Sequence, residues 1–387
     1  MNHEFYAPAH LFFGAGCLDK LGEVELPGKK AMIITTPDDW IVECGHIDRL
    51  KALLKKGGAD AIHYNKVHPN PGKIQLEEAA EICRKEGCDM VLGFGGGSSI
   101  DTAKSVAVLA TNEGDFWDYV DTGSGKGKKI ANKPLPIIAV TTTSGTGTEA
   151  DPWVVITKEE TNEKLGFGFP GMFATYAFVD AELMTSVPPS LTAFQGFDAL
   201  FHAMEGYIAN VSTPVSDIFA LKSISLLGKS LVQAYKNGKD IEARENVAMA
   251  ATLAGVVESV SDCTGNHAIS QAMGAYHDNL PHGAALLSTA KEYYGWFEKV
   301  VPDRYADMAK ALTGDPNAQA EDLMKKLLEM MAECNVDDIK LSDYGMTYEE
   351  LPVIRDNAVY WQTFLFDNEP VPLTADEVLE IMQRSYK

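Results

Sequence analysis

VLGFGGGSSID, at residues 91–101, is the stretch that decides the fold class of this chain. Its apolar start predicts a buried strand over residues 89–94, its glycines predict a tight turn, and its end predicts a helix from about Ser98 to Ala110. Ser98 or Ser99 is expected to cap that helix. A strand that leads through glycines into a helix start is typical of an anion site, because free N–H groups and the helix dipole favour negative charge.

The glycine stretch alone leaves two interpretations open. It lacks the Gly-Lys-Ser/Thr of a P-loop, and Ser98 stands where a G-x-G-x-x-G motif would have its last glycine. It is therefore either a phosphate-binding turn or a turn that only lets a helix pack on a strand. A second polar loop, TTTSGTGTE at 141–149, follows the apolar strand predicted at 136–141. Two such loops at one sheet edge favour a shared nucleotide crevice.

Strand and helix patterns alternate through the first half of the chain. Short apolar runs at 31–35, 60–64 and 136–141 predict strands, and the periodicity around 47–54 and 75–87 predicts helices. Continuous apolar strands between helices indicate a parallel sheet covered on both faces. After Pro188-Pro189 the pattern becomes helical, with helices expected at 191–209, 214–236, 241–260, 303–312, 318–334 and 374–385. We therefore expect two domains, an α/β domain at 1–188 and an all-helical domain at 189–387.

Composition excludes several classes of protein. The 387 residues carry a formal net charge of −22, which argues against binding to nucleic acid or to an anionic membrane. The six cysteines form no C-x-x-C pair, which favours a reducing compartment over a disulfide framework. We find no signal peptide and no apolar run long enough for a transmembrane helix, so we expect a cytoplasmic protein.

The segment FDALFHAME, at 197–205, carries the first indication of a metal site. Asp198 and His202 lie four residues apart and therefore leave the same face of the expected helix. Such a pair is either half of a metal site or an ordinary pair on a surface helix. His267, His277 and His282 form a second histidine-rich stretch. Spacing does not decide whether His277 or His282 would complete the site.

In combination and order these motifs resemble the iron-containing (group III) alcohol dehydrogenase family, over nearly the whole chain. The resemblance implies a Rossmann-like N-terminal α/β domain and an all-α C-terminal domain, the dehydroquinate synthase-like fold, with the site in the cleft between them. The segments that carry it are Phe12-Phe13-Gly14-Ala15-Gly16, Pro69-Asn70-Pro71, Gly95-Gly96-Gly97-Ser98 with Asp101 and Lys104, the loop from Thr142 to Glu149, Asp180 with Leu183, Gly196 to Glu205, and Pro281-His282-Gly283.

The resemblance also implies site residues. The metal, Fe²⁺ or Zn²⁺, would be held by Asp198, His202, His267 and His282. The cofactor, NAD or NADP, would contact Asp38, Asn70, Gly95, Gly96, Gly97, Ser98, Asp101, Thr142, Thr143, Thr146, Thr148, Lys164 and Leu183. No further catalytic residue is assigned.

Three positions depart from the family pattern or stay open. Gln271 stands where many members carry a second histidine, and the segment 274–282, which contains His277, is one residue longer than usual. Asp38 after the strand at 31–35 favours NAD, because its charge would repel a 2′-phosphate. If Thr36 or Pro37, and not Asp38, lies next to the ribose 2′ position, NADP would also bind.

The function that the resemblance implies is a metal-dependent alcohol dehydrogenase or aldehyde reductase. It would transfer a hydride between a small primary alcohol and the nicotinamide, and family members are often homodimers or larger. Rivals are a dehydroquinate synthase-like lyase, a glycerol dehydrogenase or lactaldehyde reductase, and a metallohydrolase. The neighbourhood of the predicted ligands is poor in basic residues and favours a small, fairly apolar substrate; the apolar residues there are Phe197, Phe201, Met204, Met273 and Tyr276.

Overall fold

A parallel sheet organises the first half of the chain in the computed structural model, which describes residues 4–387. Across the described residues the strand order is β1-β8-β5-β4-β2-β3, and every neighbouring pair is parallel. The strands are β1 (His10–Phe13), β2 (Lys30–Ile34), β3 (Asp60–Tyr64), β4 (Met90–Gly95), β5 (Ile137–Thr141) and β8 (Tyr176–Val179). This confirms the predicted sheet type, and β1 and β8 add two strands that the sequence analysis did not predict.

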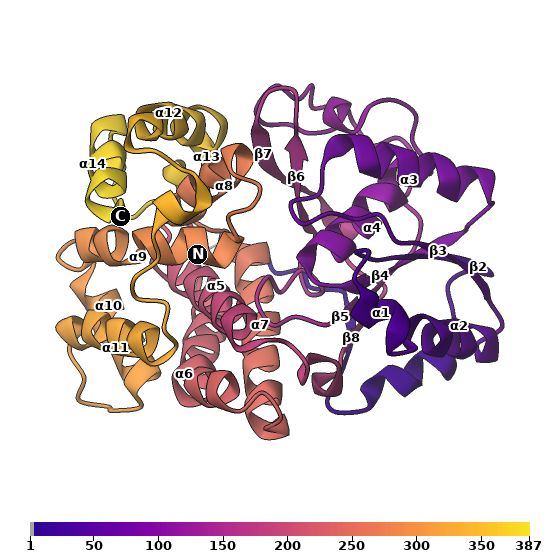
Figure 1. Ribbon diagram of the computed structural model, residues 1–387, viewed down its shortest axis with the longest axis horizontal. Coiled ribbons are helices and arrows are strands. Elements are labelled where there is room, and N and C mark those ends of the chain that lie inside the picture. Colours follow the sequence, from indigo (N-terminus) through magenta and orange to yellow (C-terminus); the bar gives the residue numbers. More distant parts are fainter. Residues whose placement is uncertain (1–3) are drawn as a thin grey trace.

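Helices cover both faces of this sheet, as the continuous apolar strands required (Figure 1). Successive side chains of a strand point to opposite faces. Ile33 therefore packs with α2 (His46–Lys56), whereas Met32 packs with α3 (Lys73–Lys85) and α4 (Gly97–Leu109). The short α1 (Asp39–Glu43) precedes α2.

The start of α4 differs from the prediction in one respect. The helix begins at Gly97 with Gly96 as its N-cap, and no side chain caps it. The expectation that Ser98 or Ser99 caps the helix is wrong, because both lie inside the first turn. The N–H groups of that turn therefore have no side-chain cap competing with a ligand.

An antiparallel hairpin lies beside the main sheet and was not predicted. It pairs β6 (Trp153–Lys158) with β7 (Glu163–Gly168). Its inward residues Val154, Ile156 and Leu165 belong to the same hydrophobic cluster as α3 and α4. The hairpin brings Trp153 and Lys164 to the edge of the helical half.

The second half of the chain is helical and lies beside the sheet (Figure 1). Its largest core cluster is built from α5, α6, α7, α9, α10 and α11. The helices are α5 (Pro189–Ile208), α6 (Pro214–Lys236), α7 (Ile241–Ser261), α8 (Gly265–Tyr276), α9 (His282–Phe297), α10 (Pro302–Thr313), α11 (Ala320–Glu333), α12 (Leu351–Trp361), α13 (Thr363–Asp367) and α14 (Ala375–Ser385). Each helix predicted in this half is present, and α8, α9, α12 and α13 come in addition.

The two halves touch closely where the loop at 141–149, called the threonine loop from here on, meets α7. A Cβ added at Gly147 would lie 2.5 Å from the backbone nitrogen of Gly255, so only glycines allow this approach. Beside it, Thr252 Oγ1 donates a hydrogen bond to Glu149 Oε1 at 2.6 Å. Within residues 4–387, no single helix combines the length and apolar character needed to cross a membrane; α7 and α8 do so only as a pair bent by 103°.

Candidate metal centre and cofactor cleft

A cavity of about 130 Å³ lies where the sheet half and the helical half meet. The sheet half lines it with residues that include Asn70, Gly97, Ser98, Thr146, Thr148 and Lys164. The helical half contributes His202, Glu258, His267, Gln271 and His282. The cavity therefore joins the glycine turn and the threonine loop to the histidine cluster.

The predicted ligands Asp198, His202, His267 and His282 converge from three helices. Asp198 and His202 come from α5, His267 from α8, and His282 from the first residue of α9. Asp198 Oδ1 lies 3.7 Å from His202 Nδ1, 3.6 Å from His267 Nε2 and 3.4 Å from His282 Nε2. These separations suit donor atoms that share one ion, because ligands about 2 Å from an ion lie some 3–4 Å apart.

Three of the four donor atoms of this cluster are buried without a hydrogen-bond partner among the described residues. Asp198 Oδ1, His202 Nδ1 and His267 Nε2 are all buried and unpaired. Leaving buried polar atoms unpaired is costly, so three of them turned toward one another indicate a missing ligand. The residues present therefore fit a divalent metal ion.

Outer contacts fix the imidazoles of two predicted ligands. His267 Nδ1 lies 2.8 Å from Glu205 Oε1, and His282 Nδ1 lies 2.8 Å from Ser270 Oγ. In both rings this leaves Nε2 facing Asp198. A partner on the second ring nitrogen sets the tautomer and the orientation of a metal-binding histidine.

The charge states of the cluster also suit a cation. Burial lowers the pKa of His202 to about 4 and that of His282 to about 3, so both offer a neutral nitrogen near pH 7. Burial alone would raise the pKa of Asp198, but His202 and His282 hold it below its usual value. Burial alone would lower the pKa of His267, but Cys263 and Glu205 raise it well above its usual value, so this ring would release a proton on binding an ion. One carboxylate with three imidazoles, once neutral, is a common donor set for Fe²⁺ and Zn²⁺.

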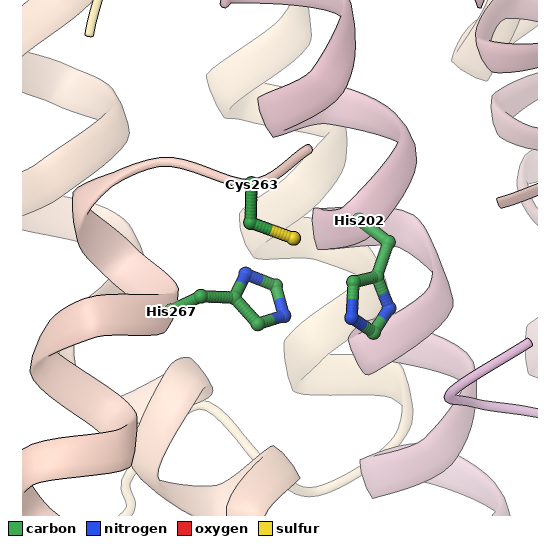
Figure 2. A group of neighbouring side chains, drawn as sticks. All are labelled: His202, Cys263 and His267. Atoms are coloured by element: carbon green, nitrogen blue, oxygen red, sulfur yellow. The ribbon is translucent and has the colours of Figure 1, made fainter. Parts of the chain in front are cut away.

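A thiol that the sequence analysis did not single out lies beside the cluster. Figure 2 shows Cys263, from the link between α7 and α8, with its sulfur directed toward the space between His202 and His267. One donor atom from each of these three residues lies within 4.8 Å of the others. Burial raises the pKa of Cys263 well above its usual value, so the thiol is protonated at neutral pH.

The glycine turn and the threonine loop pack against each other. A Cβ at Gly96 would lie 3.0 Å from Thr143 Cγ2, and one at Gly97 would lie 2.8 Å from Thr146 Cγ2. Both loops follow neighbouring strands, β4 and β5, at the same sheet edge. This is the single crevice that the two sequence motifs suggested.

The predicted cofactor residues divide into two groups. Seven line the cavity: Asn70, Gly97, Ser98, Asp101, Thr146, Thr148 and Lys164. Of the others, Gly95, Gly96, Thr142 and Thr143 lie in the same two loops just outside it. Leu183 is buried in the hydrophobic cluster between the sheet and α2, and Asp38 is exposed after β2, where it accepts a hydrogen bond from Thr36 Oγ1. Their roles stay predictions.

Asp101 and Lys164 have internal partners within the cavity wall. Asp101 accepts hydrogen bonds from Thr148 Oγ1 and the backbone nitrogen of Val155, both at 2.9 Å. Lys164 Nζ donates to Asn70 Oδ1 at 2.7 Å. Burial lowers the pKa of Lys164 to about 8. These contacts tie the hairpin to the glycine turn and to the loop around Asn70.

The structure places Gln271 and His277 apart. Gln271 lines the cavity, and its Oε1 accepts a hydrogen bond from Gln362 Nε2 at 2.7 Å. His277 follows α8 and lies 3.6 Å from Glu350, outside the cavity wall. His282, and not His277, therefore joins the cluster around Asp198.

The five apolar residues named near the predicted ligands do not line the cavity, although most of its accessible surface is apolar. Phe197, Phe201, Met204 and Met273 pack in the core, and Tyr276 is exposed on the surface. Two residues of the cavity wall were missed by the sequence analysis, Glu258 and Trp153. Glu258 Oε2 lies 3.7 Å from His202 Nε2, and burial raises the pKa of its carboxyl well above the usual value.

Comparisons with known proteins agree with this geometry. Residues 8–181 match the family described as iron-containing alcohol dehydrogenase, and residues 192–386 match the C-terminal part of the same family. A choline dehydrogenase from Bacillus subtilis is 36% identical over 92% of this chain and 86% of its own length.

Two solved structures are similar over nearly their whole length. An alcohol dehydrogenase from an archaeal, halo-thermophilic source in a Red Sea brine pool has a TM-score of 0.93 and 32% identity, with 100% of both chains covered. The NADH-dependent butanol dehydrogenase A of Thermotoga maritima has a TM-score of 0.88 and 29% identity, and covers 100% of this chain and 99% of its own.

Proposed function

This chain belongs to the iron-containing alcohol dehydrogenase family and is a metal-dependent alcohol dehydrogenase, and from that premise we propose how its residues perform the reaction. The reaction is hydride transfer between a small primary alcohol and the nicotinamide of NAD. The observation that carries the proposal is the convergence of one carboxylate and three imidazoles, three of whose donor atoms are buried without a hydrogen-bond partner.

The ion is held by Asp198, His202, His267 and His282. When bound, Fe²⁺ supplies Lewis-acid activation of the substrate hydroxyl, and a nicotinamide cofactor supplies the hydride acceptor. Glu205 and Ser270 keep the imidazoles of His267 and His282 turned toward Asp198. The protein thus presents a fixed donor set whose open side faces the cavity.

The pyrophosphate of the cofactor binds at the start of α4. Three features support this: the uncapped first turn at Gly97, the close packing of the threonine loop, and the cavity that runs from Ser98 to the histidines. Asp38 is exposed just after β2, and a carboxylate there would favour NAD over NADP by repelling a 2′-phosphate. The NADH-dependent relative from Thermotoga maritima supports the same preference.

The rival functions are not favoured by the comparisons. A lyase of the dehydroquinate synthase type and a metallohydrolase share parts of the site, but both halves of the chain match an alcohol dehydrogenase family. The names of the relatives include choline and butanol dehydrogenases, which act on alcohols of different charge. The names of the relatives therefore do not identify the alcohol, and we expect the cavity of this chain to select the part of the substrate beyond the hydroxyl.

The first test compares His282→Ala with His277→Ala, both loaded anaerobically with Fe²⁺. We expect His282→Ala to lose the ion and the oxidation of 1-butanol with NAD, and His277→Ala to keep both. Metal content by plasma emission and NADH formation at 340 nm are the measurements. Full turnover by metal-free wild type, or metal loss in His277→Ala alone, would contradict the proposal.

We also propose a domain boundary, a location in the cell and an oligomeric state. We place the domain boundary near residue 188, between the end of β8 and the start of α5. We propose a cytoplasmic location, which agrees with six cysteines that form no disulfide. We propose a homodimer or larger assembly, which light scattering of the purified protein would measure.

A further inference from the structure

One buried thiol has no role in the function proposed above. Cys263 lies in the link between α7 and α8 and is 3% exposed. Contacts on both sides fix this link: the Cys263 N–H donates to Asp262 Oδ1 at 2.7 Å, and the Cys263 carbonyl accepts from Asn368 Nδ2 at 3.2 Å. Asp262 has a positive φ of 55°, which is costly for a residue other than glycine. The chain therefore holds the thiol at a defined place.

The thiol faces two imidazoles that have unpaired nitrogens. Figure 2 shows the sulfur directed toward the space between His202 and His267. One donor atom from each of the three side chains lies within 4.8 Å of the others. His202 Nδ1 and His267 Nε2 are buried and make no hydrogen bond among residues 4–387. Zinc binds thiolate sulfur at about 2.3 Å and imidazole nitrogen at about 2.0 Å, so small side-chain shifts would bring these donors onto one ion.

The sulfur gives one side of the histidine cluster a different donor character from the other. On the side of Asp198 and His282 the donors are oxygen and nitrogen, which suit Fe²⁺ and Mn²⁺. On the side of Cys263 the donor is a soft sulfur, which selects thiophilic ions such as Zn²⁺. The imidazoles of His202 and His267 lie between the two sides, so the identity of the ion decides which side it takes.

The two ion positions cannot be filled together. The ring of His267 belongs to both sets of neighbouring donors, one with the thiol and one with Asp198 and His282. Its Nδ1 is occupied by Glu205, which leaves Nε2 for an ion. A ring nitrogen has a single lone pair, so an ion in one position excludes an ion from the other.

The two positions also differ in their access to substrate. His282 lines the cavity, whereas Cys263 does not. An ion that exchanges His282 for the sulfur therefore moves away from the wall where the alcohol and the cofactor would meet. A thiophilic ion would occupy the shared imidazoles without supporting turnover.

We propose that Cys263, His202 and His267 form a second ion position, which takes a thiophilic divalent cation such as Zn²⁺ or Cd²⁺ and excludes the catalytic Fe²⁺. On binding, the S–H bond breaks, a metal–sulfur bond forms and the proton passes to the solvent; no electron is transferred. The ion itself removes the proton, as metal ions do from thiols that are protonated without metal. The inference rests on the proposed function in one respect, because the ion that it excludes is the catalytic ion.

The first test follows Cd²⁺, which absorbs in the ultraviolet when it binds a thiolate. One equivalent of Cd²⁺ is added to the reduced, metal-free protein under nitrogen. We expect a thiolate-to-cadmium charge-transfer band in wild type and none in Cys263→Ser, which keeps the size of the side chain. Cys44→Ser, which removes an exposed thiol, is the control and should keep the band. A band that survives in Cys263→Ser, or its absence in wild type, would overturn the proposal.

Affinities for a soft and a hard ion separate coordination from packing. Competition with a chelator of known affinity is measured for Zn²⁺ and Mn²⁺ in wild type and in Cys263→Ser. We expect the affinity for Zn²⁺ to fall at least about tenfold and that for Mn²⁺ to change less than about threefold, because only the soft ion uses the sulfur. Retained Mn²⁺ binding also shows that the variant is folded. Equal losses for both ions would refute the proposal, because Cys263 would then serve only the packing of the link.

The overlap of the two positions is tested by counting ions. With Zn²⁺ and Fe²⁺ both in excess, plasma emission should find a single ion per chain, and two ions per chain would contradict the exclusion. His282→Ala removes a ligand of the catalytic ion alone, so it should weaken Mn²⁺ binding and keep the cadmium band. Loss of the band in His282→Ala would show that the thiol adds no ion position of its own.

The cadmium band needs no turnover and so separates this inference from the proposed function. A band in a protein that, loaded with Fe²⁺, oxidises no 1-butanol would sink the proposed function alone. Oxidation of 1-butanol by a protein that shows no band would sink the second ion position alone.

Discussion

Glu205 is the residue whose role can be tested most sharply outside the cavity. It is fully buried and accepts hydrogen bonds from Thr264, Tyr294 and the His267 ring. In Glu205→Gln the amide brings two hydrogens to a place where all neighbours donate. We expect the affinity for Fe²⁺ or Zn²⁺ to fall roughly 10- to 100-fold, as for other partners of metal-binding histidines.

Competition with a chelator of known affinity measures this loss. Glu369→Gln is the control, because Glu369 is also buried and accepts from Tyr293 and Gly265 but does not touch a predicted ligand. Equal losses in the two variants would show that any buried carboxylate of this network matters only for folding. A loss confined to Glu205→Gln assigns the effect to the orientation of His267.

Among individual residues, the sequence indicated Asp198 and His202 of the predicted metal cluster but not Glu258. Asp198 and His202 were visible because an i,i+4 pair of these types is chemically suggestive. Glu258 carried a weaker signal: it shares a helical face with Ala251 and Ala254, which are buried, so a charge there conflicts with the apolar pattern. Only the structure shows that this face meets a cavity and not the core.

At the scale of elements, α4 and the threonine loop form one unit. Gly97→Ala would place a Cβ 2.8 Å from Thr146 Cγ2, so the loop or the helix start must shift. Overpacking of this kind costs about 1–3 kcal/mol. We therefore expect KM for NAD to rise about 5- to 100-fold, with a smaller change in KM for the alcohol.

A second substitution tests the cause. Thr146→Ser removes the methyl group that the new Cβ meets, so Gly97→Ala/Thr146→Ser should recover most of the affinity for NAD. NADH fluorescence titration gives the dissociation constants of the single and double variants directly. If the double variant binds no better than Gly97→Ala, steric conflict between the two loops is not the reason for the loss.

Long periodic elements were predictable and short or mixed ones were not. The buried strands β2, β4 and β5 and the helices α6 and α7 have the apolar runs and periods that local patterns report. The hairpin β6–β7 was not predicted because its polar turn at 159–162 joins two strands that are only half buried. The helices α8 and α9 were not predicted because their glycine and histidine residues weaken the apolar periodicity.

At the scale of the whole molecule, the contact between Gly147 and Gly255 holds the two halves at the distance that the cavity requires. A Cβ at Gly255 would lie 2.9 Å from Gly147 Cα and closer still to its carbonyl oxygen. Helix propensity alone favours Ala over Gly by about 1 kcal/mol. At Gly255 we expect alanine to lower the free energy of unfolding, because its Cβ would meet backbone atoms of Gly147, which cannot move aside as a flexible side chain could.

We expect Gly255→Ala to lower the denaturation midpoint in urea and to weaken NAD binding, since the threonine loop must move away from α7. Gly295→Ala is the matched control: Gly295 also lies inside a helix, but a Cβ there meets nothing within 4 Å. That variant should gain about 0.5–1 kcal/mol and bind NAD as wild type does. If Gly255→Ala is as stable as Gly295→Ala, the halves separate without cost, and the cavity depends on the cofactor to hold it closed.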